Sequence, residues 1–368
     1  MDKQVKESLT VSPFFIFFLI HGSQTGVGML SFQNEIIKNA EQDAWISVLL
    51  VGFSFHLIIW MIYFLLKRST KGDIFSLHQQ LFGNWFGSIL NIFLYVYMIL
   101  ITSSVIRSYV ETLHVWAFPY IEIWELSLIV LLATTYIVFG GFRVVTGICF
   151  WGVVIPSLLL FTLYYLFPYA QWDNLKPYLN HSWNDYFNSS KNIIYMYLGV
   201  GFLLIYFPFI KDNVNSKKWA HISQFYTTFI YFILTVTSLV FFSLGQLEHI
   251  TWPTLNFSKI IYLPFIERFE FVYIFTWLFV ILPPCCVALW SGTRILRKTI
   301  NLKAKYSLWI SSSIIYLVVI NFKSQIEVET LNRVVSLAGS IFLFCYIPVL
   351  FIWLNIYNIL FKRKRYKH

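Results

Sequence analysis

Two glycine-rich segments interrupt apolar stretches of this sequence and have the composition to bind a small molecule through the main chain. The first is HGSQTGVG at residues 21–28, and the second is LGVG at residues 198–201. A glycine in a helix interior costs about 1 kcal/mol relative to alanine, and unpaired N–H or C=O groups in hydrocarbon cost more. Freed backbone groups suit a small zwitterion, because N–H groups attract a carboxylate and carbonyls attract an ammonium.

We therefore expect both segments to contact a ligand, through Gly22, Gln24, Thr25, Gly26, Gly28, Leu198, Gly199 and Gly201. The alternative is that these glycines only permit close helix packing, as is common in membrane proteins. The same Gly-Val-Gly triplet occurs in both segments, which favours the binding site. Leucine at Gly26 or Gly199 is then expected to abolish the ligand response while expression stays near normal.

The residue patterns needed for catalysis or cofactor binding do not occur. The sequence has no phosphate-binding glycine loop with a lysine, and its four cysteines lack metal-ligand spacing. We therefore predict that the chain is not an enzyme and binds no metal or cofactor. The cysteines are expected to be small core residues.

The elements that must position the glycine segments are membrane-spanning helices. The chain has 368 residues, of which 58% are hydrophobic and 12% are charged, whereas a soluble domain has about 25% charged residues. Its long apolar runs predict an all-α polytopic membrane protein with ten transmembrane helices. The spans are placed at 12–34, 44–66, 84–112, 124–140, 143–168, 190–211, 218–245, 270–296, 305–323 and 331–361.

Basic residues concentrate between alternate spans, as the positive-inside rule describes. Dense clusters lie at 294–305 and in a basic C-terminal tail at 362–368, so both termini are expected to be cytoplasmic. Topology and contact with anionic membrane lipid account for the net charge of +10, and we expect no nucleic acid partner.

The two Gly-Val-Gly triplets fall in spans one and six. Five spans is an odd separation, so the second copy runs through the bilayer in the opposite direction, which is typical of an inverted-topology repeat. We predict a single transmembrane domain over 1–368 with a five-plus-five inverted repeat of the leucine-transporter type. Repeat one covers about 12–168 and repeat two about 190–361, with spans one and six broken.

Four segments carry a resemblance to a known family: HGSQTGVGML (21–30), NAEQDAWISVLL (39–50), YIVFGGFRVVTGICFWGVVIP (136–156) and FIERFEFVYIFTWL (265–278). They resemble the B subunit of the spore germinant receptors, in the spore germination permease family of the amino acid–polyamine–organocation superfamily. The resemblance covers nearly the whole chain. It implies a nutrient sensor in the spore inner membrane, with both termini cytoplasmic or core-facing, that works with an A membrane subunit and a C lipoprotein.

The family pattern also implies ligand contacts in spans three and eight. Helix depth selects Tyr97, Ile101 and Thr102 at the middle of span three, and Cys286 and Val287 beyond two prolines of span eight. Core packing is an equally good interpretation of these five residues. The proposed pocket contains no charged residue, so we expect a neutral nutrient, with an amino acid first.

Two functions stay open. The first is a nutrient-sensing subunit of a spore germinant receptor, which binds its nutrient at the midplane and signals to partner subunits to trigger germination. The second is a cation-coupled amino acid permease. The scarcity of ionisable residues within the spans favours the sensor, because proton coupling has no obvious carboxylate.

Three further expectations concern a charged pair, two histidines and a loop. Arg107 and Glu111, toward the outer end of span three, either form an ion pair that gates the outer entrance or extend to the interface. His21 and His56 are expected to be hydrogen-bonded structural histidines. The aromatic loop 169–189 is expected to fold over the outer face.

Overall fold

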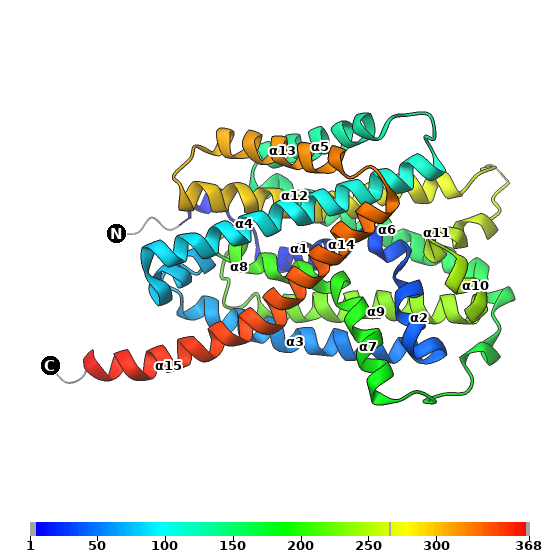
Figure 1. The fold of residues 1–368 in the computed structure, drawn as a ribbon, viewed down its shortest axis with the longest axis horizontal. Helices are drawn as coiled ribbons and strands as arrows, with labels where there is room; N and C mark the ends of the chain where they lie inside the picture. Colours follow the sequence, from blue (N-terminus) through cyan, green and yellow to red (C-terminus); the bar gives the residue numbers. More distant parts are fainter. Residues whose placement is uncertain (1–4, 265, 366–368) are drawn as a thin grey trace.

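A computed structural model describes residues 5–264 and 266–365, and within this range every regular element is a helix. The helices run roughly along one direction, which is horizontal in Figure 1. Eight helical segments are long and apolar enough to cross a membrane, and two shorter apolar helices lie at Pro13–Gln24 and Ile123–Phe139. Together they correspond to the ten predicted spans, although the number of crossings stays a prediction.

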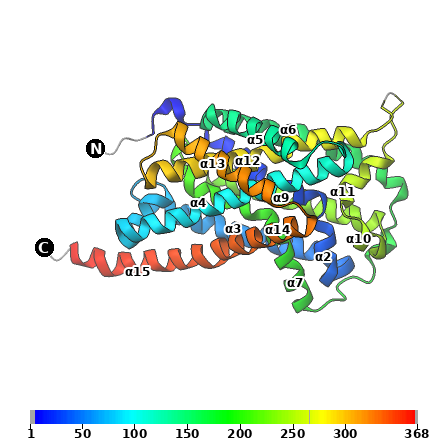
Figure 2. The same ribbon diagram turned by 45° about the horizontal axis from the view of Figure 1, so that its top comes forward.

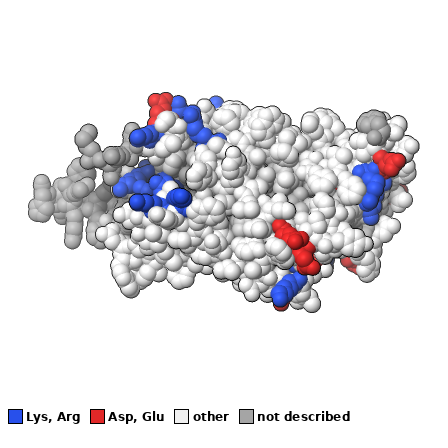
Figure 3. Space-filling model, turned by 90° about the horizontal axis from the view of Figure 1, so that it is seen from above, with Lys and Arg blue, Asp and Glu red and all other residues white. Residues whose placement is uncertain are grey.

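The surface agrees with a multi-pass membrane protein. Figure 3 shows Lys and Arg gathered at the end of the bundle where α12 ends and α13 begins, while most of this face between the two ends carries no charge. Large apolar side chains are exposed along the spans, for example Phe53 at 63% and Phe161 at 77%. The first and last described segments lie at the same end of the bundle in Figures 1 and 2, as an even number of crossings requires.

Spans one to five correspond to α1 (Ile16–Gln24) with η3 (Val27–Leu30) and α2 (Phe32–Ala40), α3 (Ala44–Arg68), α4 (Ile74–Trp116), α5 (Ile123–Phe139), and α6 (Phe142–Ser157) with η5 (Leu158–Tyr169). Spans six to ten correspond to α7 (Trp183–Ile193) with η7 (Ile194–Phe202), α8 (Leu203–Tyr206) and η8 (Phe207–Phe209), then α9 (Lys217–Phe241), α12 (Glu270–Thr299), α13 (Ala304–Asn321), and α14 (Gln325–Ser340) with the π-helical η10 (Ile341–Tyr346) and α15 (Ile347–Arg365). Short helices η6 (Trp172–Leu175), α10 (Leu244–His249), α11 (Pro253–Asn256) and η9 (Phe257–Ile260) lie in the outer loops.

Two helices are longer than predicted. Helix α4 starts ten residues before span three, and Gly83 with a φ of 76° bends the chain between its two parts. Glycine adopts this left-handed conformation without the steric cost that a side chain would add. At the other end, α15 continues to Arg365, so the predicted tail 362–368 is helical as far as that residue. Residues 366–368 lie outside the described part.

The centre of the bundle is formed by α1 and α12. Helix α12 packs against α4, α6 and α1, and α1 packs against α9, α6 and η7. Apolar residues on all sides of a helix are typical of a fully buried element, and residues 280–289 of α12 are all buried. Side chains on α1 and α12 are therefore the ones that any internal cavity must contact.

The loop 169–189 folds over the end of the bundle where α3 begins, which is the end predicted to be the outer face. The Asp43 carboxylate, at the start of α3, accepts hydrogen bonds from the backbone N–H groups of Leu179 (3.0 Å) and Asn180 (2.8 Å) and from the Tyr186 hydroxyl (3.1 Å). The side chain of Asp43 is fully buried. A buried carboxylate with three donors is well satisfied, so it fixes the loop to the end of α3.

Candidate functional site

Span one is interrupted at its glycine segment. Helix α1 ends at Gln24, and Thr25 and Gly26 are extended before η3 begins at Val27. The Tyr231 hydroxyl donates to the Gln24 carbonyl (2.7 Å), and the Trp277 indole N–H donates to the Gly26 carbonyl (3.3 Å). The predicted break is therefore present, but side chains of α9 and α12 occupy two of the carbonyls that were expected to be free for an ammonium.

Span six departs from the prediction in a different way. Its glycine triplet lies within η7, a nine-residue 3-10 helix, and the chain does not open there. A 3-10 helix keeps i to i+3 hydrogen bonds and so frees few backbone groups. Gly199 has a steric role instead, because a Cβ at this position would lie 2.1 Å from the Ser23 carbonyl oxygen. Span six therefore continues as a 3-10 helix that packs closely against span one, whereas span one is broken.

Between these two segments lies a cavity, which we call the central cavity, with about 550 Å³ of empty space including its opening. The predicted site residues that line it are Gln24, Thr25, Gly26, Gly28, Ile101, Leu198 and Gly199. The remaining lining residues are Ser23, Val27, Val105, Ser108, Tyr195, Met196, Phe202, Pro284 and Val335. None of these residues carries a charge, and Gly26 faces open space, since no atom lies within 4 Å of its ideal Cβ position.

The other predicted site residues lie outside the central cavity, because they pack against neighbouring helices. Gly22 packs against Pro283, and both Gly201 and Tyr97 pack against Phe342. Cys286 and Val287 belong to the fully buried stretch of α12. Thr102 is the last of these predicted residues, and its hydroxyl donates to the Met98 carbonyl (2.9 Å) of its own helix. Depth along a helix selected Ile101, which lines the cavity, but depth does not fix the rotation of the helix about its axis.

Polar residues at the outer side of the cavity were missed by the sequence analysis. The Ser108 hydroxyl accepts a hydrogen bond from the Asn332 amide (3.1 Å), and Ser104 bonds to Asn332 and lies 3.4 Å from the Tyr195 hydroxyl. Ser104 lies three residues after Ile101 and Ser108 four residues after Ser104, which places all three on one helix face. This spacing could have identified Ser104 and Ser108, which lie beyond the part of span three that was selected by its depth in the membrane.

Next to Ser108 in the sequence, Arg107 connects α4 to the turn between α13 and α14. Its guanidinium bonds to the Glu111 carboxylate (2.7 Å) and to the carbonyls of Phe322 (2.7 Å) and Lys323 (3.2 Å). The predicted ion pair is confirmed, and the alternative of extension to the interface is wrong, because the Arg107 side chain is 0% exposed. This contact holds the outer ends of three helices together beside the cavity.

Glu111→Gln is expected to lower the melting temperature of the purified protein by several degrees. The change removes the carboxylate that compensates a buried guanidinium, and loss of such a partner costs about 1–3 kcal/mol. The matched control is Lys38→Met, which breaks an exposed pair with Glu35 and is expected to change little, because both side chains are more than half exposed. An equal effect of both substitutions would show that the Arg107 contact does not stabilise the outer end.

Beside the cavity, the Gln24 side chain connects α1 to α9. Its amide donates to Gln224 (2.8 Å) and its carbonyl oxygen accepts from Thr227 (3.0 Å), which also bonds to His21 (2.8 Å). The prediction of hydrogen-bonded histidines is confirmed for His21. It is confirmed for His56 as well, since its Nδ1 lies 2.8 Å from Nδ1 of His221.

The cysteines differ in their surroundings. Cys149, Cys285 and Cys286 are buried, as predicted, whereas Cys345 is exposed on η10, so the expectation of a core position is wrong there. Neighbouring helices leave part of η10 uncovered, since Ile341 of the same segment is 52% exposed. Among the residues that the structure describes, no group of three His, Cys, Asp or Glu side chains is placed to hold a metal ion.

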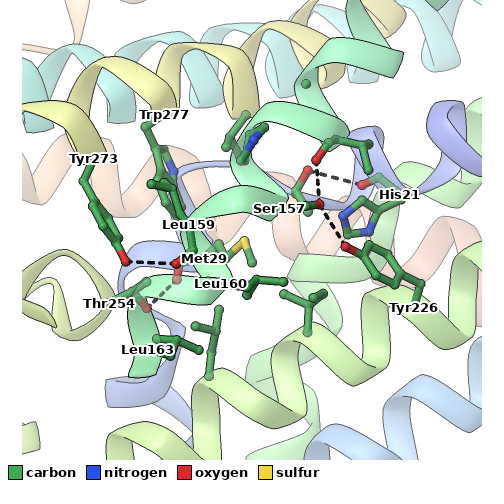
Figure 4. Close-up of a pocket in the computed structure, with 17 residues that line it drawn as sticks. His21, Met29, Ser157, Leu159, Leu160, Leu163, Tyr226, Thr254, Tyr273 and Trp277 are labelled. Atoms are coloured by element: carbon green, nitrogen blue, oxygen red, sulfur yellow. Dashed lines mark hydrogen bonds between the residues drawn. The ribbon is translucent and has the colours of Figure 1, made fainter. Parts of the chain in front are cut away.

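A second cavity, which we call the side cavity, lies between α1, α6, η5, α9 and α12 (Figure 4). The sequence did not predict it. Trp277 and Tyr273 of α12 and Leu159 and Leu160 of η5 surround it together with Tyr226 of α9. Thr25, at the break of span one, lines both cavities.

Comparison with known proteins places this geometry in context. The profile of a family described as spore germination protein matches residues 10–328. The spore germination protein GerQB of Bacillus cereus is 39% identical over 352 residues, which are 96% of this chain and 97% of that protein. Spore germination protein B2 of Bacillus subtilis (strain 168) is 22% identical over 303 residues, covering 81% and 82% of the two chains.

Among solved structures, that of Mhp1, a nucleobase-cation-symport-1 family transporter in a closed conformation with bromovinylhydantoin bound, has a TM-score of 0.68. The match covers 99% of this chain and 82% of that chain at 11% identity, so it concerns the fold alone. The predicted all-α, leucine-transporter-type fold is thereby confirmed. The limits of the two repeats stay a prediction.

Proposed function

We propose, from the premise that this chain belongs to the spore germination protein family, that it senses a small neutral nutrient in the central cavity. Membership follows from the profile match and from the relative that is 39% identical over 96% of the chain. The protein is accordingly a germinant-receptor-like or permease-like membrane protein and not an enzyme. The interrupted backbone of Thr25 and Gly26, open toward an uncharged cavity, is the observation that supports the binding site.

The chemistry of the lining supports an amino acid or a similar neutral solute. The N–H groups of Val27 and Gly28 come directly after the break in span one, and backbone N–H groups are donors that a carboxylate can accept from. Hydroxyls of Ser108 and Tyr195 lie on the outer side, where polar groups of the solute find partners. Because no charged residue lines the cavity, a solute with net charge would be buried without compensation.

The proposed ligand contacts are therefore the lining residues among those predicted, with Ser108 and Tyr195 added. Signalling, in this proposal, passes from the central cavity to the A and C subunits of a germinant receptor in the spore inner membrane, with both termini on the cytoplasmic or core side. The family of the relatives and the basic end of the bundle support this part. The two repeats, at about 12–168 and 190–361, belong to the same proposal.

The test is ligand-dependent thermal stabilisation of the purified chain in nanodiscs, across a panel of neutral amino acids, sugars and nucleosides. A ligand that binds only the folded state at 100 times its Kd stabilises it by about 2.7 kcal/mol. We expect at least one neutral amino acid to raise the melting temperature, and Ile101→Trp to remove this shift by filling the cavity. If no compound raises the melting temperature, the nutrient site is not in this chain alone.

The second candidate is a cation-coupled amino acid permease, and the same protein in liposomes separates the two. A sensor binds its nutrient saturably without accumulating it, whereas a permease accumulates it when a sodium or proton gradient is applied. If the gradient drives accumulation of the nutrient well above equilibrium, the protein is a permease and the sensor proposal is wrong.

A further inference from the structure

We propose that the side cavity is a second binding site, which takes a small uncharged and mainly apolar molecule and is coupled to the break of span one. Binding to the side cavity does not depend on the proposed nutrient function. The coupling deepens that function, because it links a second ligand to the nutrient site.

The lining of the side cavity indicates the class of molecule. No lining residue is Asp, Glu, Lys or Arg, and seven are Val, Leu or Ile, while Trp277, Tyr226 and Tyr273 supply three large aromatic rings. The cavity has about 550 Å³ of empty space including its opening. Ligand sites typically combine apolar walls with a few polar groups. This cavity therefore has the composition of a site for a small apolar molecule.

The polar side chains of the side cavity already have hydrogen-bond partners, and the partner of His21 is Thr227 (2.8 Å). The Ser157 and Tyr226 hydroxyls lie 2.8 Å apart, the Tyr273 hydroxyl bonds to Thr162, and the Thr254 hydroxyl donates to the Met29 carbonyl (2.9 Å). Figure 4 shows the pair of Ser157 and Tyr226 at one end of the cavity and the pair of Thr254 and Met29 at the other. A zwitterion would have to break these bonds or bury its charges without partners. An apolar molecule leaves them intact, so the side cavity discriminates against the solutes that suit the central cavity.

The wall formed by η5 gives an apolar molecule a short path from the membrane. Its residues alternate between the two sides: Leu159, Leu160 and Leu163 line the cavity, whereas Leu158 and Phe161 are 59% and 77% exposed toward the lipid. This wall is a 3-10 helix of twelve residues, although such helices are uncommon beyond four residues. Apolar molecules concentrate in the bilayer, on the other side of this single layer of residues.

Three contacts connect the side cavity to the break of span one. Thr25 lines both cavities, Trp277 donates to the Gly26 carbonyl, and Thr254 donates to the Met29 carbonyl. Gly26 is itself a wall of the central cavity. A molecule that moves Trp277 or Thr254 thus changes the backbone that the nutrient contacts, and by linkage the nutrient changes the affinity of the side cavity equally.

The test is heavy-atom quenching of tryptophan fluorescence by bromocyclohexane, with the full chain in nanodiscs. Bromocyclohexane is compact, uncharged and apolar, and Trp277 lies in the cavity wall. We expect a saturable component of quenching in addition to a linear one from probe dissolved in the lipid. Cyclohexane, which does not quench, should compete for the saturable component, and Trp277→Phe should remove it.

Leu160→Phe and Leu158→Phe form a matched pair for this test. Leu160 lines the cavity, so its replacement should raise the half-saturating probe concentration about tenfold or more, through overpacking. Leu158 faces the lipid, and its replacement should leave the titration unchanged. If Leu160→Phe fails to fold, the wild-type and Trp277→Phe titrations decide alone. Purely linear quenching, or saturable quenching that survives Trp277→Phe, would overturn the proposal.

Coupling is measured separately, as the shift in nutrient affinity when cyclohexane is present. A change in affinity supports the connection through the break of span one. An unchanged affinity, with saturable probe binding, would refute the coupling while leaving the second site in place. If no nutrient binds at all, the proposed function fails, and the quenching titration still decides the side cavity.

Discussion

Replacement of Gly26 by leucine is expected to abolish nutrient binding while the protein stays folded. A Cβ at this position meets no atom within 4 Å, and the extended backbone of Gly26, with φ of −177°, is one that any residue adopts. The leucine side chain would therefore extend into the central cavity and take the space of the nutrient. We expect the thermal shift caused by nutrient to vanish and the melting temperature without nutrient to change by only a few degrees.

Two controls accompany Gly26→Leu. Gly26→Ala adds one methyl group to the open space and should weaken binding without abolishing it. Ser340→Ala, at the end of α14 and outside the lining of the central cavity, should have no effect. Wild-type nutrient binding by Gly26→Leu would place the ligand somewhere other than the central cavity.

Replacement of Gly199 by leucine is expected to prevent folding instead. A Cβ here would lie 2.1 Å from the carbonyl oxygen of Ser23 and 2.3 Å from its carbonyl carbon, and both atoms belong to the backbone of α1. Backbone atoms of a packed helix cannot move aside as the end of a side chain can, so η7 and α1 would have to separate. We expect little monodisperse protein after detergent extraction, measured by fluorescence-detected size-exclusion chromatography.

The matched control is Gly147→Leu in α6, where no atom lies within 4 Å of the ideal Cβ position. It should give a normal yield of folded protein. A normal yield and melting temperature for Gly199→Leu would show that η7 is not packed tightly against α1. The sequence predicted that these two glycines behave alike. In the structure both line the central cavity, but Gly26 faces open space whereas Gly199 also packs against the backbone of α1.

A structural feature could be predicted from the sequence where one local pattern has one physical meaning. Apolar runs located the spans, because few other structures use twenty such residues in a row. The triplet around Gly26 marked a true break in span one. The same triplet failed in span six, because glycine serves both an unusual backbone conformation and a close approach between helices. The sequence alone does not show which of these two roles Gly199 has.

The rest of the site depends on how helices are rotated against one another. Ile101 was found by its depth, but Tyr97, one turn away, packs against Phe342. The side cavity gave no signal at all, because Leu160, Tyr226 and Trp277 are ordinary residues of apolar helices and come together only in three dimensions. Its recognition required the arrangement of four helices that are distant in the sequence.

The attachment of the outer loop to Asp43 affects how membrane sidedness should be mapped. Epitope tags and protease sites report sidedness only where the chain tolerates an insertion and is accessible. An insertion near Leu179 or Asn180 would disrupt the hydrogen bonds to the buried carboxylate, so a negative result there would reflect damage or protection. The short connection between α12 and α13, where Ile300 is 53% exposed, is a better position for a reporter on the opposite side.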